Sequence, residues 1–428
     1  MRRVYSIGGI GEGLTDRERK NLAILESIRR EGQITKTEIS KATRLNIVTV
    51  SNYVNHFVEA GLVLEKGLDV SEGGRRPMLI ELNSKYGYAV GVGLSMTDIV
   101  GIITDLSGNI LMKVKREKPR VSATTNGLTE ESGEILVEGM ISVAEEVLSR
   151  SNVPREQIRG LGVGIPGIID EPGGTIRLSS EFGDSKDDPL DNISMCIPVR
   201  DLFEKRFDLP IFIENDATVA AFGVLWLGLE PGIRNMIYMY SEVGCGIIID
   251  GQIYRGASGS AGELSIIDPW PGDDSPDKWH LQRDCILRTG DLDINILQKA
   301  EEALKANSSP SGFLAKIKQD KSLLSIHQVI DAAKDGDPFA VSLIEDAGDR
   351  LGIKVAFLVN LLNPEVVVVG GGIEAAGSIL LDPIKKRVKS CAYDEPASRV
   401  KVVPSRLGDG SIALGAACLV IQSVFAQA

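Results

Sequence analysis

Residues 88–111, YAVGVGLSMTDIVGIITDLSGNIL, decide the fold once they are compared with residues 235–256, NMIYMYSEVGCGIIIDGQIYRG. Each stretch reads as a strand, a tight turn, a second strand and a glycine-marked turn; in the first, the strands are expected at 89–93 and 99–105. The surrounding chain alternates Gly/Val/Ile-rich strands with helical stretches, which is typical of α/β architecture. A hairpin that occurs twice predicts a duplicated α/β domain with a ligand-binding cleft between the copies.

Composition narrows the class of protein. The chain has 428 residues and a net charge of −12, which argues against one large basic surface. Residues 1–82 nevertheless hold 13 Lys and Arg against 11 Asp and Glu, whereas the remainder holds 34 against 48. A slightly basic N-terminal segment on an acidic body fits a nucleic-acid module attached to another domain.

Cysteines and apolar runs indicate the compartment. The five cysteines lie far apart with no paired spacing, which predicts reduced thiols and not a disulfide framework. The first residues lack an apolar segment long enough for a signal peptide, and the most apolar region, at 354–372, is interrupted by two asparagines and a proline. We therefore expect a cytoplasmic protein with no membrane partner.

Residues 20–59 predict three short helices. In the second, Thr35 is expected to be the N-cap, with Glu38 as its capping-box partner and with Ile39 and Ala42 facing inward.

The third helix should bury an apolar stripe and expose a second face made of Val48, Thr49, Asn52 and Tyr53. A helix, a short turn and a helix with polar residues near its start form a helix-turn-helix, whose second helix meets base edges in the major groove. The alternative is a small helical bundle without a ligand.

The following segment favours DNA binding over that alternative. Residues 61–83 read as a strand, a glycine-rich turn and a strand, which is a hairpin wing with Arg75 and Arg76 at its tip. Guanidinium groups suit phosphates and narrow minor grooves. The sequence thus predicts a winged helix-turn-helix at 20–83, preceded by a flexible arm at 1–19.

A polar triplet marks a candidate site in the body. A buried strand at 211–213 runs directly into Glu214, Asn215 and Asp216, and a helix of small residues follows. A carboxylate at the end of a strand above a cleft can act as a general base toward a hydroxyl group. The alternative for Asp216 is a helix N-cap, a position that Asp favours.

These motifs, taken together, resemble the repressor–open reading frame–kinase (ROK) family in its transcriptional-regulator branch. The resemblance covers about residues 20–425 and rests on the segments GGRRP (73–77), GIPGIID (164–170), ENDA (214–217), GSAGE (259–263), NLLNPEVVVVGGGI (360–373) and GDGSIALGAA (408–417). It implies a duplicated ribonuclease-H-like, actin/hexokinase-like sugar-kinase fold with an interdomain cleft. The first α/β subdomain is expected at 84–208, completed by a C-terminal helix at about 410–428, and the second at 209–409.

The resemblance also implies roles for three residues. In the family's kinases the position of Asp216 deprotonates the sugar hydroxyl, and the positions of Asn215 and Glu263 bind the sugar. We therefore expect these three residues to bind a sugar here.

The phosphate hairpins depart from the kinase pattern. The first hairpin has Gly93, Ser95, Met96 and Thr97 where family kinases carry Asp and then Gly-Gly-Thr, and the second has Ser241, Glu242, Val243 and Gly244 in place of Thr-Gly-Ile-Gly. The missing Asp removes a carboxylate that would organise Mg²⁺. Glu242 would place a negative charge beside a polyphosphate. We expect no kinase activity, no catalytic residue and no cofactor.

The zinc site of the family is also expected to be missing. Ile266 replaces the usual His, and the following segment offers only His280 and Cys285 as ligands. Two ligands cannot close a tetrahedral site, so no metal is expected.

The sequence therefore predicts a sugar-responsive DNA-binding regulator, expected to be a repressor. Its partners would be a double-stranded operator and a small-molecule sugar effector, and it would assemble as a homodimer or homotetramer. Two alternatives stay open: a bifunctional sugar kinase that also binds DNA, and a DNA-binding regulator whose body binds no ligand.

Overall fold

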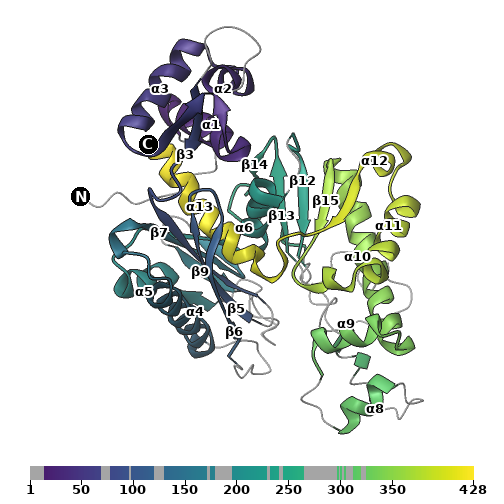
Figure 1. Ribbon diagram of the computed structural model, residues 1–428. Helices are drawn as coiled ribbons and strands as arrows, with labels where there is room; N and C mark the ends of the chain where they lie inside the picture. Colours follow the sequence, from purple (N-terminus) through teal and green to yellow (C-terminus); the bar gives the residue numbers. More distant parts are fainter. Residues whose placement is uncertain are drawn as a thin grey trace. The chain divides into compact units, whose positions relative to one another are not determined.

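The computed structural model describes residues 14–68, 78–95, 98–119, 130–170, 174–178, 195–228, 232–240, 244–264, 296–297, 299–300, 303–304, 312–319 and 324–428. The chain divides into two compact units, which we call the first unit (residues 1–223 and 410–428) and the second unit (residues 224–409). Figure 1 labels many of their helices and strands.

The N-terminal part of the first unit, residues 15–82, is called the head. It comprises α1 (Asp16–Glu31), β1 (Ile34–Thr35), α2 (Lys36–Thr43), α3 (Ile47–Glu59), β2 (Val63–Leu68) and β3 (Met78–Leu82). The strands form a sheet in the order β1-β3-β2. Thr35 caps α2, and a reciprocal pair of hydrogen bonds with Glu38 completes the capping box, as the sequence predicts.

Two details of the head differ from expectation. Helix α1 begins at Asp16, so residues 16–19, assigned above to a flexible arm, are helical. A capping box between Thr15 and Glu18 fixes this start. In α2 the side chain of Ala42 is exposed and only Ile39 is buried, because this helix of eight residues turns a single position toward the core.

The first unit contains a five-stranded sheet in the order β11-β7-β4-β5-β6. Its strands are β4 (Tyr88–Leu94), β5 (Asp98–Asp105), β6 (Ile110–Glu117), β7 (Ile158–Ile165) and β11 (Ile211–Asn215). Strands β4, β5 and β6 pair antiparallel, whereas β7 pairs parallel to both β4 and β11. The hairpin predicted from the opening motif is therefore β4–β5.

One face of this sheet packs against α4 (Glu130–Arg150) and α5 (Val199–Arg206). A smaller sheet in the order β10-β9-β8 lies in the same unit. The remaining elements here are η1 (Arg155–Gln157), β8 (Ile168–Asp170), β9 (Thr175–Leu178) and β10 (Met195–Ile197).

The other face of the first sheet packs against α13 (Ser411–Gln427), which also contacts α6 (Asp216–Gly223). Glycines permit this contact. A Cβ atom at Gly91 would lie 1.9 Å from the carbonyl oxygen of Ala413, and one at Gly162 would lie 2.0 Å from that of Ala416. Backbone therefore rests on backbone, and no larger residue fits at either position.

The second unit contains another five-stranded sheet, in the order β14-β13-β12-β15-β16. Its elements are η2 (a π-helix, Val224–Gly228), β12 (Met236–Met239), β13 (Cys245–Ile249), β14 (Gln252–Ile253), α8 (Gly312–Gln319), α9 (Ile326–Lys334), α10 (Pro338–Leu362), β15 (Val366–Val369), η4 (Ile373–Ala376), α11 (Ser378–Cys391), α12 (Asp394–Arg399) and β16 (Lys401–Pro404), with η5 (Gly408–Gly410) before α13. Apolar residues of α9, α10 and α11 bury one face of the sheet.

The two large sheets have the same topology. Numbered in chain order within each sheet, the strands lie 3-2-1-4-5 in both, with an antiparallel hairpin followed by parallel strands. This repetition confirms the predicted duplication. The boundary between the subdomains differs from the expected one at 208/209, because β11 pairs with β7 and so belongs to the first unit.

The C-terminal stretch Gly408–Gln427 is the one helix in the described part of the chain that is long and apolar enough to cross a membrane. Within the most apolar 18 residues, 78% are buried in the protein. Its packing on the glycine face of the first sheet explains why the helix is apolar.

Candidate functional site

The predicted DNA-reading face lies on α3. Asn46 caps this helix by accepting a hydrogen bond from the backbone N–H of Thr49 at 2.8 Å. Val50, Val54 and Phe57 of α3 are buried in the core of the head. The opposite face of the helix therefore points outward. The helix therefore presents its first turn to solvent, as a recognition helix must.

The predicted contact residues differ in exposure. Val48 is 65% exposed and Asn52 is exposed, whereas Thr49 and Tyr53 are half-buried. The ring of Tyr53 meets Phe57 edge to face, with centroids 6.2 Å apart, so only part of it is available. Ile47, which was not among the predicted contacts, is 45% exposed beside Val48. Two apolar side chains open to water at the start of this helix are suited to thymine methyl groups.

Arg75 and Arg76, predicted at the tip of the wing, lie outside the described residues. The strands that would carry them are present: β2 and β3 pair antiparallel from Val63–Leu82 to Leu68–Met78. DNA contact by the two arginines stays a prediction.

The predicted sugar site begins where β11 meets α6. Asn215 ends the strand, and its side-chain oxygen accepts the backbone N–H of Thr218 at 3.1 Å. Its amide group donates to the carbonyl oxygen of Gly167 at 3.2 Å. The first bond is the bond of an N-cap. Asn215 thus fills the capping role that the alternative interpretation gave to Asp216.

Asp216 is the first residue of α6 and is 6% exposed. One carboxylate oxygen accepts the backbone N–H of Ala217 at 2.8 Å. A buried carboxylate at a helix N-terminus is favoured by the helix dipole. The start of α6 is therefore a favourable position for the negative charge of this carboxylate.

Glu263 belongs to the second unit, so its predicted role beside Asp216 stays a prediction. It forms an isolated bridge with Gly244. Surrounding protein removes water from its carboxyl group and raises its pKa, although the residue as a whole remains exposed. Burial, and after it the charge of Glu263, raises the pKa of the Cys245 thiol to about 12, so this cysteine is an inert thiol.

The phosphate hairpins are described only in part. Met96, Thr97 and residues 241–243 lie outside the described residues. Gly93 is described: a Cβ atom there would lie 2.6 Å from the Ile412 side chain and 2.7 Å from the Ala413 nitrogen. The position where family kinases carry Asp is therefore filled by α13.

The segment predicted to lack zinc, including Ile266, His280 and Cys285, also lies outside the described residues. In the part of the chain that is described, no three His, Cys, Asp or Glu side chains gather in a metal-binding group.

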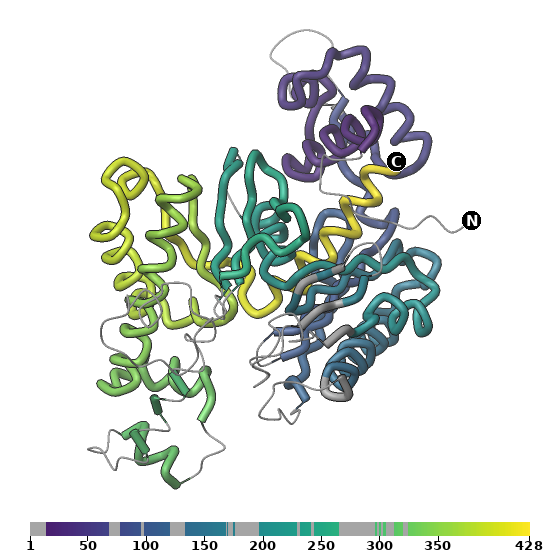
Figure 2. The backbone as a smooth tube through the Cα atoms, turned by 180° about the vertical axis from the view of Figure 1, so that it is seen from behind, coloured from purple at the N-terminus to yellow at the C-terminus, as the bar shows by residue number. Residues whose placement is uncertain are grey.

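Helix α13 connects the two predicted sites within the first unit. Toward the body, a Cβ atom at Gly415 would lie 1.9 Å from the carbonyl oxygen of Val219 in α6. Toward the head, the buried amide group of Asn21 in α1 donates to the carbonyl oxygens of Ala426 at 3.0 Å and Ala428 at 2.6 Å. Figure 2 shows the C-terminal end of α13 beside the head.

No local pattern in the sequence predicts this connection. Asn21 lies among the apolar residues of α1, and its partners are 405 and 407 residues away. Its only signal is a polar residue on the buried stripe of an amphipathic helix.

Comparison with known proteins identifies the family. The ROK family matches residues 89–269 and 300–423, and a winged helix-turn-helix DNA-binding family matches residues 17–63. The chain belongs to the ROK family.

Two relatives that match more than nine tenths of the chain are named as repressors. A putative xylose repressor of Caldicellulosiruptor sp. (strain Rt8B.4) is 30% identical over 95% of this chain and 96% of its own length. The xylose repressor of Bacillus subtilis (strain 168) is 27% identical over 93% of this chain and 94% of its own. A glucokinase of Halalkalibacterium halodurans is 30% identical over 68% of this chain and 85% of its own.

The fold also matches a solved structure. A ROK family transcriptional regulator, a homolog of the E. coli MLC protein, aligns with a TM-score of 0.69 at 21% identity, over 96% of this chain and 97% of that one. The duplicated α/β body and its N-terminal winged helix are thus a known arrangement.

Proposed function

We propose that this member of the ROK family is a transcriptional repressor that binds an operator through α3 and the wing, and binds a sugar at Asn215, Asp216 and Glu263 without phosphorylating it. Sugar binding would release the operator. The protein would act in the cytoplasm. It would assemble as a homodimer or homotetramer, because paired heads read half-sites about one DNA turn apart.

One observation carries this proposal: α13 contacts both α6, which begins at Asp216, and α1 of the head. On the α6 side the contact is backbone against backbone at Gly415, and on the head side it is made by the amide of Asn21. A shift of α6 on sugar binding would therefore displace α13 and, with it, the head. Packed elements and hydrogen bonds of this kind can carry coupling between two sites.

The chemistry of the β11–α6 junction fits a sugar. Hydroxyl groups both donate and accept, and Asp216 offers acceptors while Asn215 offers a donor and an acceptor. Hydrogen bonds to a charged group contribute roughly 1.5–3 kcal/mol each. The full-length relatives named xylose repressors favour xylose as the sugar.

The space around Gly93 supports the proposed loss of phosphorylation. No side chain fits there without moving Ile412, so the carboxylate of the kinases has no place. The alternative, a kinase that also binds DNA, is favoured by the similarity to the glucokinase. It requires ATP-dependent turnover at an ordinary enzymatic rate, about 1–10³ s⁻¹.

The test uses the full chain and a duplex that it selects from a random-sequence DNA pool. We expect xylose to release this duplex and to bind without ADP formation when ATP is supplied. Asp216→Asn should still fold and bind the duplex, but should need about tenfold more xylose or more, which corresponds to a loss of ~1.4 kcal/mol. Asp208→Asn, on the exposed turn before β11, is the control and should behave as wild type.

Three results would contradict the proposal. Failure to select any duplex would show that the head does not read DNA. Release of the Asp216→Asn variant at the wild-type xylose concentration would show that this carboxylate serves only the helix. Sustained ADP formation with xylose would show a kinase.

A further inference from the structure

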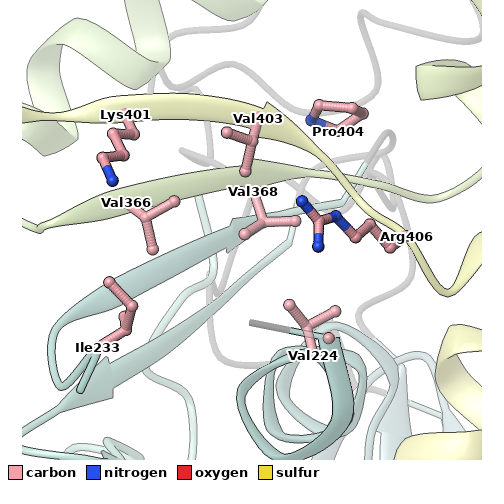
Figure 3. A pocket seen from close by; sticks show the side chains of 9 residues that line it. Val224, Ile233, Val366, Val368, Lys401, Val403, Pro404 and Arg406 are labelled. Carbon is pink, nitrogen blue, oxygen red and sulfur yellow. The ribbon is translucent and has the colours of Figure 1, made fainter. Parts of the chain in front are cut away.

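The second unit contains a cavity of about 220 Å³ on the face of its sheet opposite α10 and α11 (Figure 3). Val366 and Val368 of β15 and Val403 of β16 form its floor, and Val224 of η2 points toward them. Successive side chains of a strand point to opposite faces. The intervening Val367 and Val369 are accordingly buried in the core beneath the helices.

Two positively charged side chains lie beside this apolar floor. Figure 3 shows Lys401 beside Val366 and the guanidinium of Arg406 beside Val368, toward the two ends of the cavity. Both residues are exposed. Within the described ranges neither side chain forms a salt bridge or a hydrogen bond. The pair is conspicuous because residues 83–428 hold only 34 Lys and Arg against 48 Asp and Glu.

The cavity sets the size and chemistry of an occupant. A cavity of this volume has room for several water molecules, and so for a ligand with a short hydrocarbon chain. Ile233 and Val403 are half-buried and Pro404 is exposed, so covering their remaining apolar surface favours a hydrocarbon part. Arginine pairs with a carboxylate through two parallel hydrogen bonds, and lysine adds a second positive charge.

We propose that this cavity is a binding site for a small amphipathic carboxylate, with its hydrocarbon part on Ile233, Val403 and Pro404 and its carboxylate at Arg406 or Lys401. The site is separate from the sugar residues of β11 and α6 in the first unit. It does not depend on the function proposed above.

The residues that line the cavity lie close in sequence to the two segments that connect the units, so a ligand there could act as a regulator. The chain passes between the two units at 223/224 and at 409/410. Val224 and Gly228 follow the first passage directly, and Pro404 and Arg406 precede the second. An occupant would therefore contact both connecting segments, one of which is a π-helix, a conformation frequent at functional sites.

Methyl NMR spectra of the full chain, titrated with hexanoate, test the proposal. The methyl groups of Val366, Val368 and Val403 should shift together and saturate with one dissociation constant. Those of Val367 and Val369, on the same strand but facing the other side, should move little. Hexan-1-ol, which has the same hydrocarbon part without the charge, should bind about tenfold more weakly or worse.

Variants identify the charges responsible. The double variant Lys401→Gln/Arg406→Gln should weaken hexanoate binding at least tenfold and leave the hexan-1-ol titration unchanged, which also shows that the cavity remains folded. Lys389→Gln, an exposed lysine on α11 outside the cavity, is the charge-matched control and should bind hexanoate as wild type does. The proposal is overturned if the three valines show no saturable shift, or if the double variant binds hexanoate as tightly as the control.

Discussion

The two large sheets share one strand order but present different side chains on the face away from their covering helices. In the first sheet this face is glycine, and α13 lies so close that a Cβ atom at Gly91 or Gly162 would meet a carbonyl oxygen at 1.9 or 2.0 Å. In the second sheet the face carries Val366 and Val368, and a cavity of about 220 Å³ remains over them.

This difference assigns a mechanical role to each sheet. Where backbone packs on backbone, no side chain can change its rotamer to relieve a displacement. The first sheet therefore holds α13 firmly, and the head is joined in the chain to β4 of the same sheet. Packed interiors transmit small displacements because they are not continuously deformable. The valine face borders a cavity, although Val366 and Val368 themselves are 3% and 1% exposed.

The largest expected effect comes from adding atoms to the glycine face. Gly162→Val should fail to fold, or should lower the free energy of unfolding by roughly 3 kcal/mol or more, because its side chain collides with the backbone of α13. Val368→Ile adds a methylene group to the second sheet, where a cavity can take it, and should change stability by less than about 1.5 kcal/mol. Urea denaturation of both variants makes the comparison; equal losses would remove the distinction between the two faces.

The second effect concerns the contact of the head with α13. Asn21→Leu removes two hydrogen bonds to the carbonyl oxygens of Ala426 and Ala428 and should destabilise the chain by about 1–3 kcal/mol. It should also reduce the change in operator affinity that xylose causes.

Fluorescence anisotropy with and without xylose measures that change. Gln33→Ala, which removes an exposed hydrogen bond to Glu81 inside the head, is the control. If Asn21→Leu retains the full response to xylose, the head is not coupled through this contact.

A smaller effect is expected where the head leaves apolar surface open to water. Val48 is 65% exposed on α3 and should contact a thymine methyl group in the operator. Replacing that thymine by deoxyuridine should weaken binding by about 0.8 kcal/mol, the contribution of one buried methyl-sized group. Val48→Ala should abolish the difference between the two duplexes. A wild-type chain indifferent to deoxyuridine at every operator position would exclude methyl readout.

The smallest effect concerns a buried carboxylate in the second unit. Glu374 is 8% exposed and accepts a hydrogen bond from the Gly372 backbone at 2.6 Å. Burial is the main cause that raises its pKa. A raised carboxyl pKa means that the folded state prefers the protonated form, so the charge destabilises the fold once the pH rises above the ordinary carboxyl pKa.

Glu374→Gln should accordingly raise the free energy of unfolding at pH 7 by an energy on the order of 1 kcal/mol or less. The melting temperature should rise slightly as a result. The gain should shrink as the pH falls toward the ordinary carboxyl pKa, below which the wild-type side chain is neutral in both states. Thermal scans of both proteins at pH 7 and near pH 4 test this prediction. A stability gain of the same size at both pH values would contradict it.

Much of this architecture is predictable from local sequence patterns. The two hairpins, the capping box at Thr35 and the junction of β11 with Asp216 all follow from residues within a few positions of one another. These features depend on backbone propensity and side-chain bonds of short range, which a single sequence displays directly.

The connections between distant segments are not predictable in this way. Nothing beside Asn21 shows that its amide meets the end of the chain, and Lys401 and Arg406 resemble any surface cations. The assignment of β11 to the first unit depends on pairing with β7 across more than forty residues. Asn215 and Asp216 are both residue types that favour the N-cap position. Which of them caps α6 depends on the directions of their side chains, which the sequence does not display.

Hydrogen–deuterium exchange of the full chain with and without saturating xylose tests the central claim most directly. If sugar binding reaches the head through α13, exchange should slow in residues 211–223, in the C-terminal helix at 411–427 and in α1 at 16–31. Slowed exchange confined to 211–223, in a protein that still releases its operator with xylose, would contradict the account.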